Sequence, residues 1–66
     1  MFKNIERIIF DKGLKKRDIA KALGISYNTF LLKLKGEYYF TLDEAIKLKE
    51  ILETDLTVEE LFKTAA

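Results

Sequence analysis

The chain contains three glycines and no proline in 66 residues, and this pattern constrains its fold more than any other feature. Proline is the residue that most strongly interrupts a helix, and Leu, Lys, Glu and Ala are abundant, so helix is favoured almost throughout. Glycine then becomes the main signal for a helix end, because it readily adopts the left-handed backbone conformation that follows many helices. The glycines at positions 13, 24 and 36 therefore predict three successive helices in the first half of the chain.

The apolar spacing gives these three helices their expected bounds. The first covers about residues 2–12 and the second about residues 15–23, each ending at a glycine. Ser26 is a natural N-cap, because its hydroxyl can accept a hydrogen bond from a free backbone N–H at a helix start. It predicts that the third helix begins directly after it and ends at Gly36.

Two capping boxes predict the remaining helices. Thr41 and Thr57 each stand three residues before a glutamate, a spacing that lets the two side chains satisfy backbone N–H groups reciprocally. They indicate packing helices over about residues 42–52 and 58–64, the second with Leu61 and Phe62 turned inward. Phe40, in the connection before the first of these, is expected to turn into the core. The predicted fold is all-α, with five short helices.

Composition limits both the size and the chemistry of this fold. The length allows one domain, residues 1–66, and a hydrophobic content of 48% is too high for a disordered tail. The longest apolar runs are three residues, so we expect neither a transmembrane helix nor a signal-peptide core, and we place the protein in the cytoplasm.

The chain contains no Cys and no His, which removes the usual residues for metal sites, thiol nucleophiles and imidazole acid–base catalysis. The only adjacent carboxylates are Asp43 with Glu44 and Glu59 with Glu60, and first-turn helix positions explain both pairs. We therefore expect no metal, no cofactor and no enzymatic activity.

The net charge of +1 conceals two unlike halves. Residues 1–36 carry nine Lys or Arg against three Asp or Glu, whereas residues 37–66 carry three against eight. This asymmetry indicates a polyanionic partner for the first half, although exposed helix faces also need charge and chance can produce such a division.

The segment from Asp18 to Phe30 has the parts of a helix-turn-helix in order. Ala20 is small where two helices must approach closely, Gly24 permits a left-handed turn, and Ile25 can fill the space between the helices. The predicted motif covers about residues 15–36.

On these residues the chain resembles the Cro/C1-type (XRE-like) helix-turn-helix family, from about residue 4 to residue 63. It is similar in style to small phage and prophage repressors, in which a Phe-x-x-Lys-Leu-x-Gly segment, here residues 30–36, precedes a Phe-Thr-Leu-x-Glu segment, here residues 40–44. The resemblance implies a five-helix, lambda-repressor-like domain that places its third helix, about residues 27–35, in the major groove of double-stranded DNA. It also implies a homodimer on a two-fold operator.

The resemblance assigns roles by position. Lys16, at the start of the second helix, and Ser26 and Lys35, beside the third, would meet phosphates. The residues facing base edges would be Tyr27, Asn28, Leu31 and Leu32.

The chemistry of these residues leaves alternatives open. Asn28 can pair in a bidentate way with adenine, or it is an ordinary polar residue at a helix start. Tyr27 can contact DNA or cover Leu31, and Leu32 can contact a thymine methyl group or a partner protein. Because the third helix has no Arg or Gln, specificity is expected to rest on A·T pairs and on DNA shape.

A basic cluster would supply the salt-dependent, sequence-independent part of DNA binding. Its members flank the predicted motif and are Lys15, Lys16, Arg17, Lys33 and Lys35. Tyr38 and Tyr39 follow the third helix, where they would touch the DNA backbone or shield the edge of the core.

One domain of this size covers a single half-site, so dimerisation is expected at least on DNA. Ile46, Ile51 and Leu61 are candidate dimer contacts, unless Ile51 packs under Leu56 and Phe62 within the monomer. The alternative function is a protein-binding modulator, such as an antirepressor, with the same fold and an apolar third helix that contacts a protein instead of an operator.

Overall fold

Five helices form, and their bounds follow the capping signals closely. The structure is a computed structural model that describes residues 1–64, so the last two positions of the expected domain lie outside the described part. Its helices are α1 (Lys3–Asp11), α2 (Lys16–Leu23), α3 (Tyr27–Lys35), α4 (Leu42–Leu52) and α5 (Val58–Leu61). The expected all-α class is confirmed, and no helix within residues 1–64 is long and apolar enough to cross a membrane.

The predicted caps are present. The Ser26 hydroxyl accepts a hydrogen bond from the backbone N–H of Thr29 at 3.1 Å. Both capping boxes, at the starts of α4 and α5, are complete. All three glycines have positive φ angles, of 65°, 76° and 87° in chain order. Gly24 and Gly36 directly follow α2 and α3, and Gly13 follows α1 after one intervening residue, Lys12.

The last helix is shorter than predicted. It ends at Leu61 instead of continuing to about residue 64. Phe62 leaves the helical path and its ring packs edge-on against Phe2, at 5.5 Å between centroids, and Phe40, at 5.1 Å. Phe40 also lies 6.2 Å from Phe30, which confirms that it turns into the core. The C-cap residue of α5 thus belongs to an aromatic cluster at the edge of the core.

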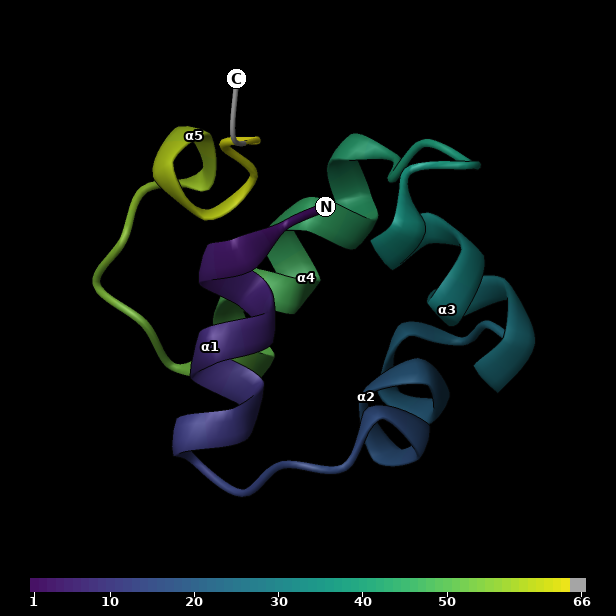
Figure 1. Cartoon of the computed structure of the whole chain (residues 1–66). Coiled ribbons are helices and arrows are strands. Elements are labelled where there is room, and N and C mark those ends of the chain that lie inside the picture. The colour runs from purple at the N-terminus through teal and green to yellow at the C-terminus, as the bar shows by residue number, and fades with distance from the viewer. Residues whose placement is uncertain (65–66) are drawn as a thin grey trace.

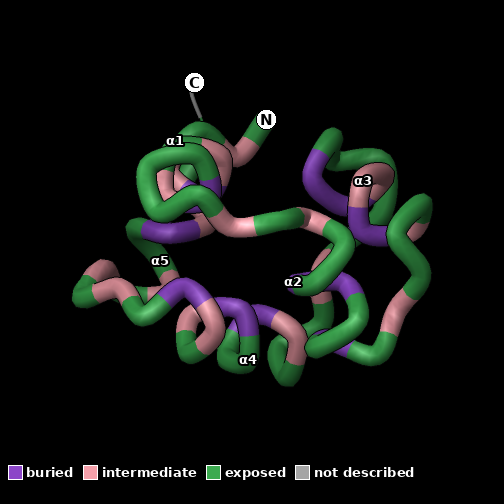
Figure 2. Tube along the Cα trace, turned by 90° about the horizontal axis from the view of Figure 1, so that it is seen from below, coloured by how far each residue is buried: buried purple, intermediate pink, exposed green. Residues whose placement is uncertain are grey.

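The helices enclose one core. α2 packs against α3 and α4, while α5 contacts α4 and α1, so that α1 and α5 lie across the molecule from α3 (Figure 1). Buried positions alternate with exposed ones along every helix, as amphipathic spacing requires (Figure 2). The buried hydrophobic residues at the centre are Ile5, Ile9, Ile19, Ala20, Leu23, Phe30, Leu34, Leu48, Leu52 and Leu61.

Lys12, which directly follows α1, caps the C-terminal end of α4. The Lys12 ammonium donates to the backbone carbonyls of Leu52, at 2.5 Å, and Glu53, at 3.0 Å. These carbonyls have no partner within the helix, so the contact stabilises its C-terminal end. Glu53 has a left-handed backbone with φ of 49°, the only positive φ of a non-glycine residue in the described chain.

Candidate nucleic-acid interface

The turn between α2 and α3 fixes the angle at which the two helices meet. Gly24 follows α2 with φ of 76°, a conformation that a side chain would strain. The N–H of Ile25 returns to the carbonyl of Ala20 at 3.0 Å, and the Ile25 side chain packs against the core. Ala20 is 1% exposed at this close approach. This is the geometry of a helix-turn-helix.

The third helix has one buried face and one free face. Phe30 and Leu34 are 0% and 3% exposed and anchor it to the core. Asn28, which is exposed, and Leu32, which is half-buried, occupy the opposite side. The exposed Lys35 extends this outer face by a further turn. Tyr27, exposed, and Leu31, half-buried, lie at the edge of the outer face, because position 27 is three and seven residues before Phe30 and Leu34.

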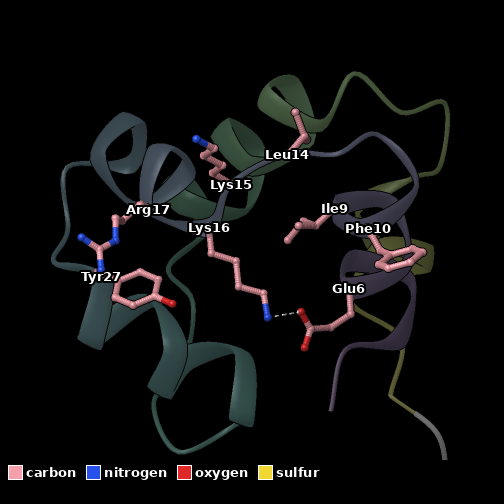
Figure 3. A pocket seen from close by; sticks show the side chains of 8 residues that line it. All are labelled: Glu6, Ile9, Phe10, Leu14, Lys15, Lys16, Arg17 and Tyr27. Atoms are coloured by element: carbon pink, nitrogen blue, oxygen red, sulfur yellow. Dashed lines mark ion pairs between the residues drawn. The ribbon is translucent and has the colours of Figure 1, made fainter.

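A groove lies beside this face, between α1 and the starts of α2 and α3 (Figure 3). Lys15 and Arg17 at the beginning of α2 are exposed, and the Arg17 guanidinium lies over the Tyr27 ring at 5.1 Å from its centroid. The Lys16 side chain extends across the groove to Glu6 on α1, with Nζ and Oε1 2.9 Å apart. Three of the predicted phosphate contacts thus line one groove, two of them with intramolecular partners.

Ser26 has its hydroxyl engaged at the start of α3. It accepts from the Thr29 backbone N–H and donates to the Thr29 hydroxyl at 2.8 Å. Its proton is therefore engaged by the Thr29 hydroxyl, and a phosphate that accepted this proton would replace that bond and not the cap. Thr29, half-buried beside Ser26, is a polar residue near the outer face of α3 that the sequence pattern did not single out.

The structure corrects one predicted phosphate contact. Lys33 is only 9% exposed, and its ammonium lies 2.5 Å from Glu44 Oε1 on α4 and over the Phe40 ring at 5.9 Å. The cause is its place in the helix, since position 33 shares the inner face with positions 30 and 34. Its charge is directed into the molecule and away from the surface where a phosphate would lie.

The same contacts set the ionisation of Glu44. Burial by itself would raise the pKa of this carboxyl, but the hydrogen bonds from Lys33 and from the Thr41 backbone outweigh it and hold the pKa below its usual value. Glu44 therefore remains charged in mildly acidic solution and keeps Lys33 paired.

The predicted dimer contacts separate into three environments. Leu61 is 0% exposed and belongs to the core, so the prediction that it contacts a partner is wrong. Ile51 is half-buried against that core, whereas Ile46 is 44% exposed. Leu42, one turn before Ile46 on α4, is 72% exposed. The unpartnered apolar surface of α4 therefore lies at its first two turns.

The two tyrosines after α3 do not shield the core to the same extent. Tyr39 is 94% exposed and Tyr38 56% exposed, although both line an apolar groove with Leu42. Tyr39 therefore covers little of the core edge in this structure.

These features define a helix-turn-helix DNA-binding domain: five helices, a tight glycine turn between α2 and α3, and a free outer face on α3 beside exposed cations. Comparison with family models agrees, because the model of the Cro/C1-type HTH DNA-binding domain matches residues 4–66. The chain belongs to this family. The comparisons with curated proteins and with solved structures gave no match.

Proposed function

We propose that this protein is a sequence-specific regulator of transcription, a repressor of the phage type, which reads the major groove of double-stranded DNA with α3. The observation that carries the proposal is the free outer face of α3, where Asn28 is exposed in the first turn and Leu32 follows one turn later. Asn28 would pair with adenine, and Leu31 and Leu32 would contact thymine methyl groups. Specificity would accordingly favour A·T pairs.

The phosphate contacts in this proposal come from cations beside the reading face. Lys15, Lys16 and Arg17 would contact one strand from the start of α2, and Lys35 would contact the backbone from the end of α3. Each ammonium or guanidinium that neutralises a phosphate releases counterions, so binding should weaken steeply as salt is added.

Titration of random-sequence duplex DNA at two salt concentrations tests the proposal. Lys35→Met should weaken binding to all sequences and reduce the salt slope by about one. Lys33→Met is the matched control, since it removes the same charge from the same helix at a position that faces Glu44, and its slope should equal that of the unmodified protein. If the unmodified protein shows no salt-dependent binding, the alternative function of a protein-binding modulator would be supported instead. The partly exposed Leu31 and Leu32 also suit contact with a protein.

Base reading has a separate test in the selection of bound sequences from a random duplex pool. Asn28→Ala should relax the preference at one position per half-site, with a loss of about 1–3 kcal/mol against the preferred base. A palindromic consensus would establish a two-fold operator. An unchanged consensus for Asn28→Ala would assign this residue to the helix start alone.

The protein should act as a homodimer, at least on DNA, because a single domain of this kind covers one half-site. The contact surface would be the exposed apolar residues of α4, Leu42 and Ile46, together with the exposed Tyr38 and Tyr39 in the preceding loop. Sedimentation of Leu42→Glu beside the unmodified protein, with and without a two-site duplex, tests this. Equal assembly of the two proteins on that duplex would place the interface elsewhere.

A further inference from the structure

Glu6 is an acidic residue in a groove that is otherwise lined by basic and apolar side chains and by Tyr27. It projects from α1 into the groove that Lys15, Lys16 and Arg17 line (Figure 3). The Glu6 side chain as a whole is 43% exposed, but its Oε1 atom is shielded from solvent and has no hydrogen-bond partner among the described residues. The Lys16 ammonium, 2.9 Å away, is the compensating charge for this atom.

The ion pair with Glu6 holds the Lys16 side chain across the groove, toward α1. A carboxylate oxygen removed from water is stabilised mainly by a nearby positive charge, so Glu6 favours the Lys16 conformation that crosses the groove. A DNA phosphate at the start of α2 would need the same ammonium.

We propose that Glu6 competes with the DNA phosphate backbone for Lys16 and thereby limits both the affinity and the salt dependence of DNA binding. The inference rests on the proposed DNA-binding function. Glu6 is a positioning residue in this account, because it acts on DNA through Lys16.

Glu6→Gln tests the inference, since it removes the charge and preserves the size of the side chain. Exposed ion pairs are weak, so we expect DNA binding about two- to fivefold tighter at roughly 50 mM salt. The advantage should shrink near 200 mM salt, because the released Lys16 forms a fuller phosphate contact and the salt slope becomes steeper by up to about one. The melting temperature should change little, which separates this effect from a structural one.

A double-mutant cycle with Lys16→Met identifies the route of the effect. If Glu6 acts through Lys16, Glu6→Gln should give no gain in affinity when Lys16 is already Met. Asp11→Asn is the matched control for net charge, because Asp11 is exposed on the same helix and has no ion pair within residues 1–64. It should leave affinity nearly unchanged.

The possible outcomes are distinct. Absence of salt-dependent binding by the unmodified protein would overturn the proposed function itself. If the unmodified protein binds DNA in a salt-dependent way but Glu6→Gln has equal or weaker affinity, only the proposed competition for Lys16 would be overturned. A weaker affinity would indicate that Glu6 orients Lys16 toward phosphate. A gain that persists in the Lys16→Met background, or that Asp11→Asn reproduces, would also overturn it and would indicate a general charge effect.

Discussion

The ion pair between Lys33 and Glu44 joins the inner face of α3 to the first turn of α4. The two side chains are 11% and 15% exposed, and the charged atoms are 2.5 Å apart. Glu44 also accepts the Thr41 backbone N–H at 3.0 Å. Glu44→Gln is therefore an informative perturbation, because Gln can complete the same capping box while it leaves the Lys33 ammonium without a counter-charge.

The expected cost follows from this burial. Removing one member of a fully buried pair costs about 3–5 kcal/mol, because the remaining charge is left in a poorly solvated site. The residual exposure of both side chains lowers this to about 2–3 kcal/mol for Glu44→Gln. In a domain of this size each kcal/mol shifts the melting temperature by roughly 4–8 °C, so a fall of about 10–20 °C is expected. Lys33→Met should cost only about 1 kcal/mol, since Glu44 keeps its backbone partner and reaches water.

Urea unfolding, followed by far-ultraviolet circular dichroism, measures these differences. The double variant Lys33→Met/Glu44→Gln should be more stable than Glu44→Gln alone by about 1 kcal/mol or more, because it no longer buries an unpaired charge. An osmolyte such as TMAO keeps the weakest variant folded enough to measure. A cost for Glu44→Gln below about 0.5 kcal/mol, or additive single costs, would refute the reasoning.

Two further predictions concern pH and the end of α4. The pKa of Glu44 is lowered in the folded chain, because the hydrogen bonds from Lys33 and Thr41 outweigh the effect of burial. The stabilisation from the Glu44 carboxylate is therefore complete above its unfolded pKa of about 4.5 and is lost as pH falls through the lower folded value. When the free energy of unfolding is measured against falling pH, it should decline less steeply for Glu44→Gln than for the unmodified protein. Glu53→Gly should raise the free energy of unfolding by about 0.5–1 kcal/mol by relieving the left-handed backbone at φ of 49°. Glu50→Gly, in the last turn of α4, should instead lower it by up to about 1 kcal/mol, because position 50 has helical backbone. Equal effects of the two substitutions in urea unfolding would contradict the role of backbone conformation.

The helix starts, and the ends of the helices that a glycine follows, could be predicted because their causes are local. Thr41 and Thr57 each form their capping boxes within four residues, so no knowledge of the tertiary fold was needed. The buried side of α5 was less sharply defined, since four residues are too few for periodicity to separate a core position from a partner contact. Leu61 was therefore predicted both to turn inward and to contact a partner, and only the inward position is confirmed.

The candidate site was predictable in part for a related reason. Position 33 shares a helical face with Phe30 and Leu34, so the burial of Lys33 had a signal in the spacing, but its charge suggested a phosphate contact instead. The pairing of Glu6 with Lys16 had no comparable signal. It joins residues on two helices and depends on the angle set by the intervening turn, which no residue pattern specifies.

The buried contacts of α3 bear directly on how it could read DNA. Its first turn is held by the Ser26 cap, its middle by Phe30 in the core, and its last turn by the pair between Lys33 and Glu44. A helix fixed at three points along its length loses little conformational freedom when it enters a groove, so more of the contact energy appears as affinity. In the proposed complex this rigidity would compensate for an outer face of α3 with few polar groups. Lys33 would then influence DNA affinity by holding α3 in place, and the salt slope would not depend on it because its charge would not meet the DNA.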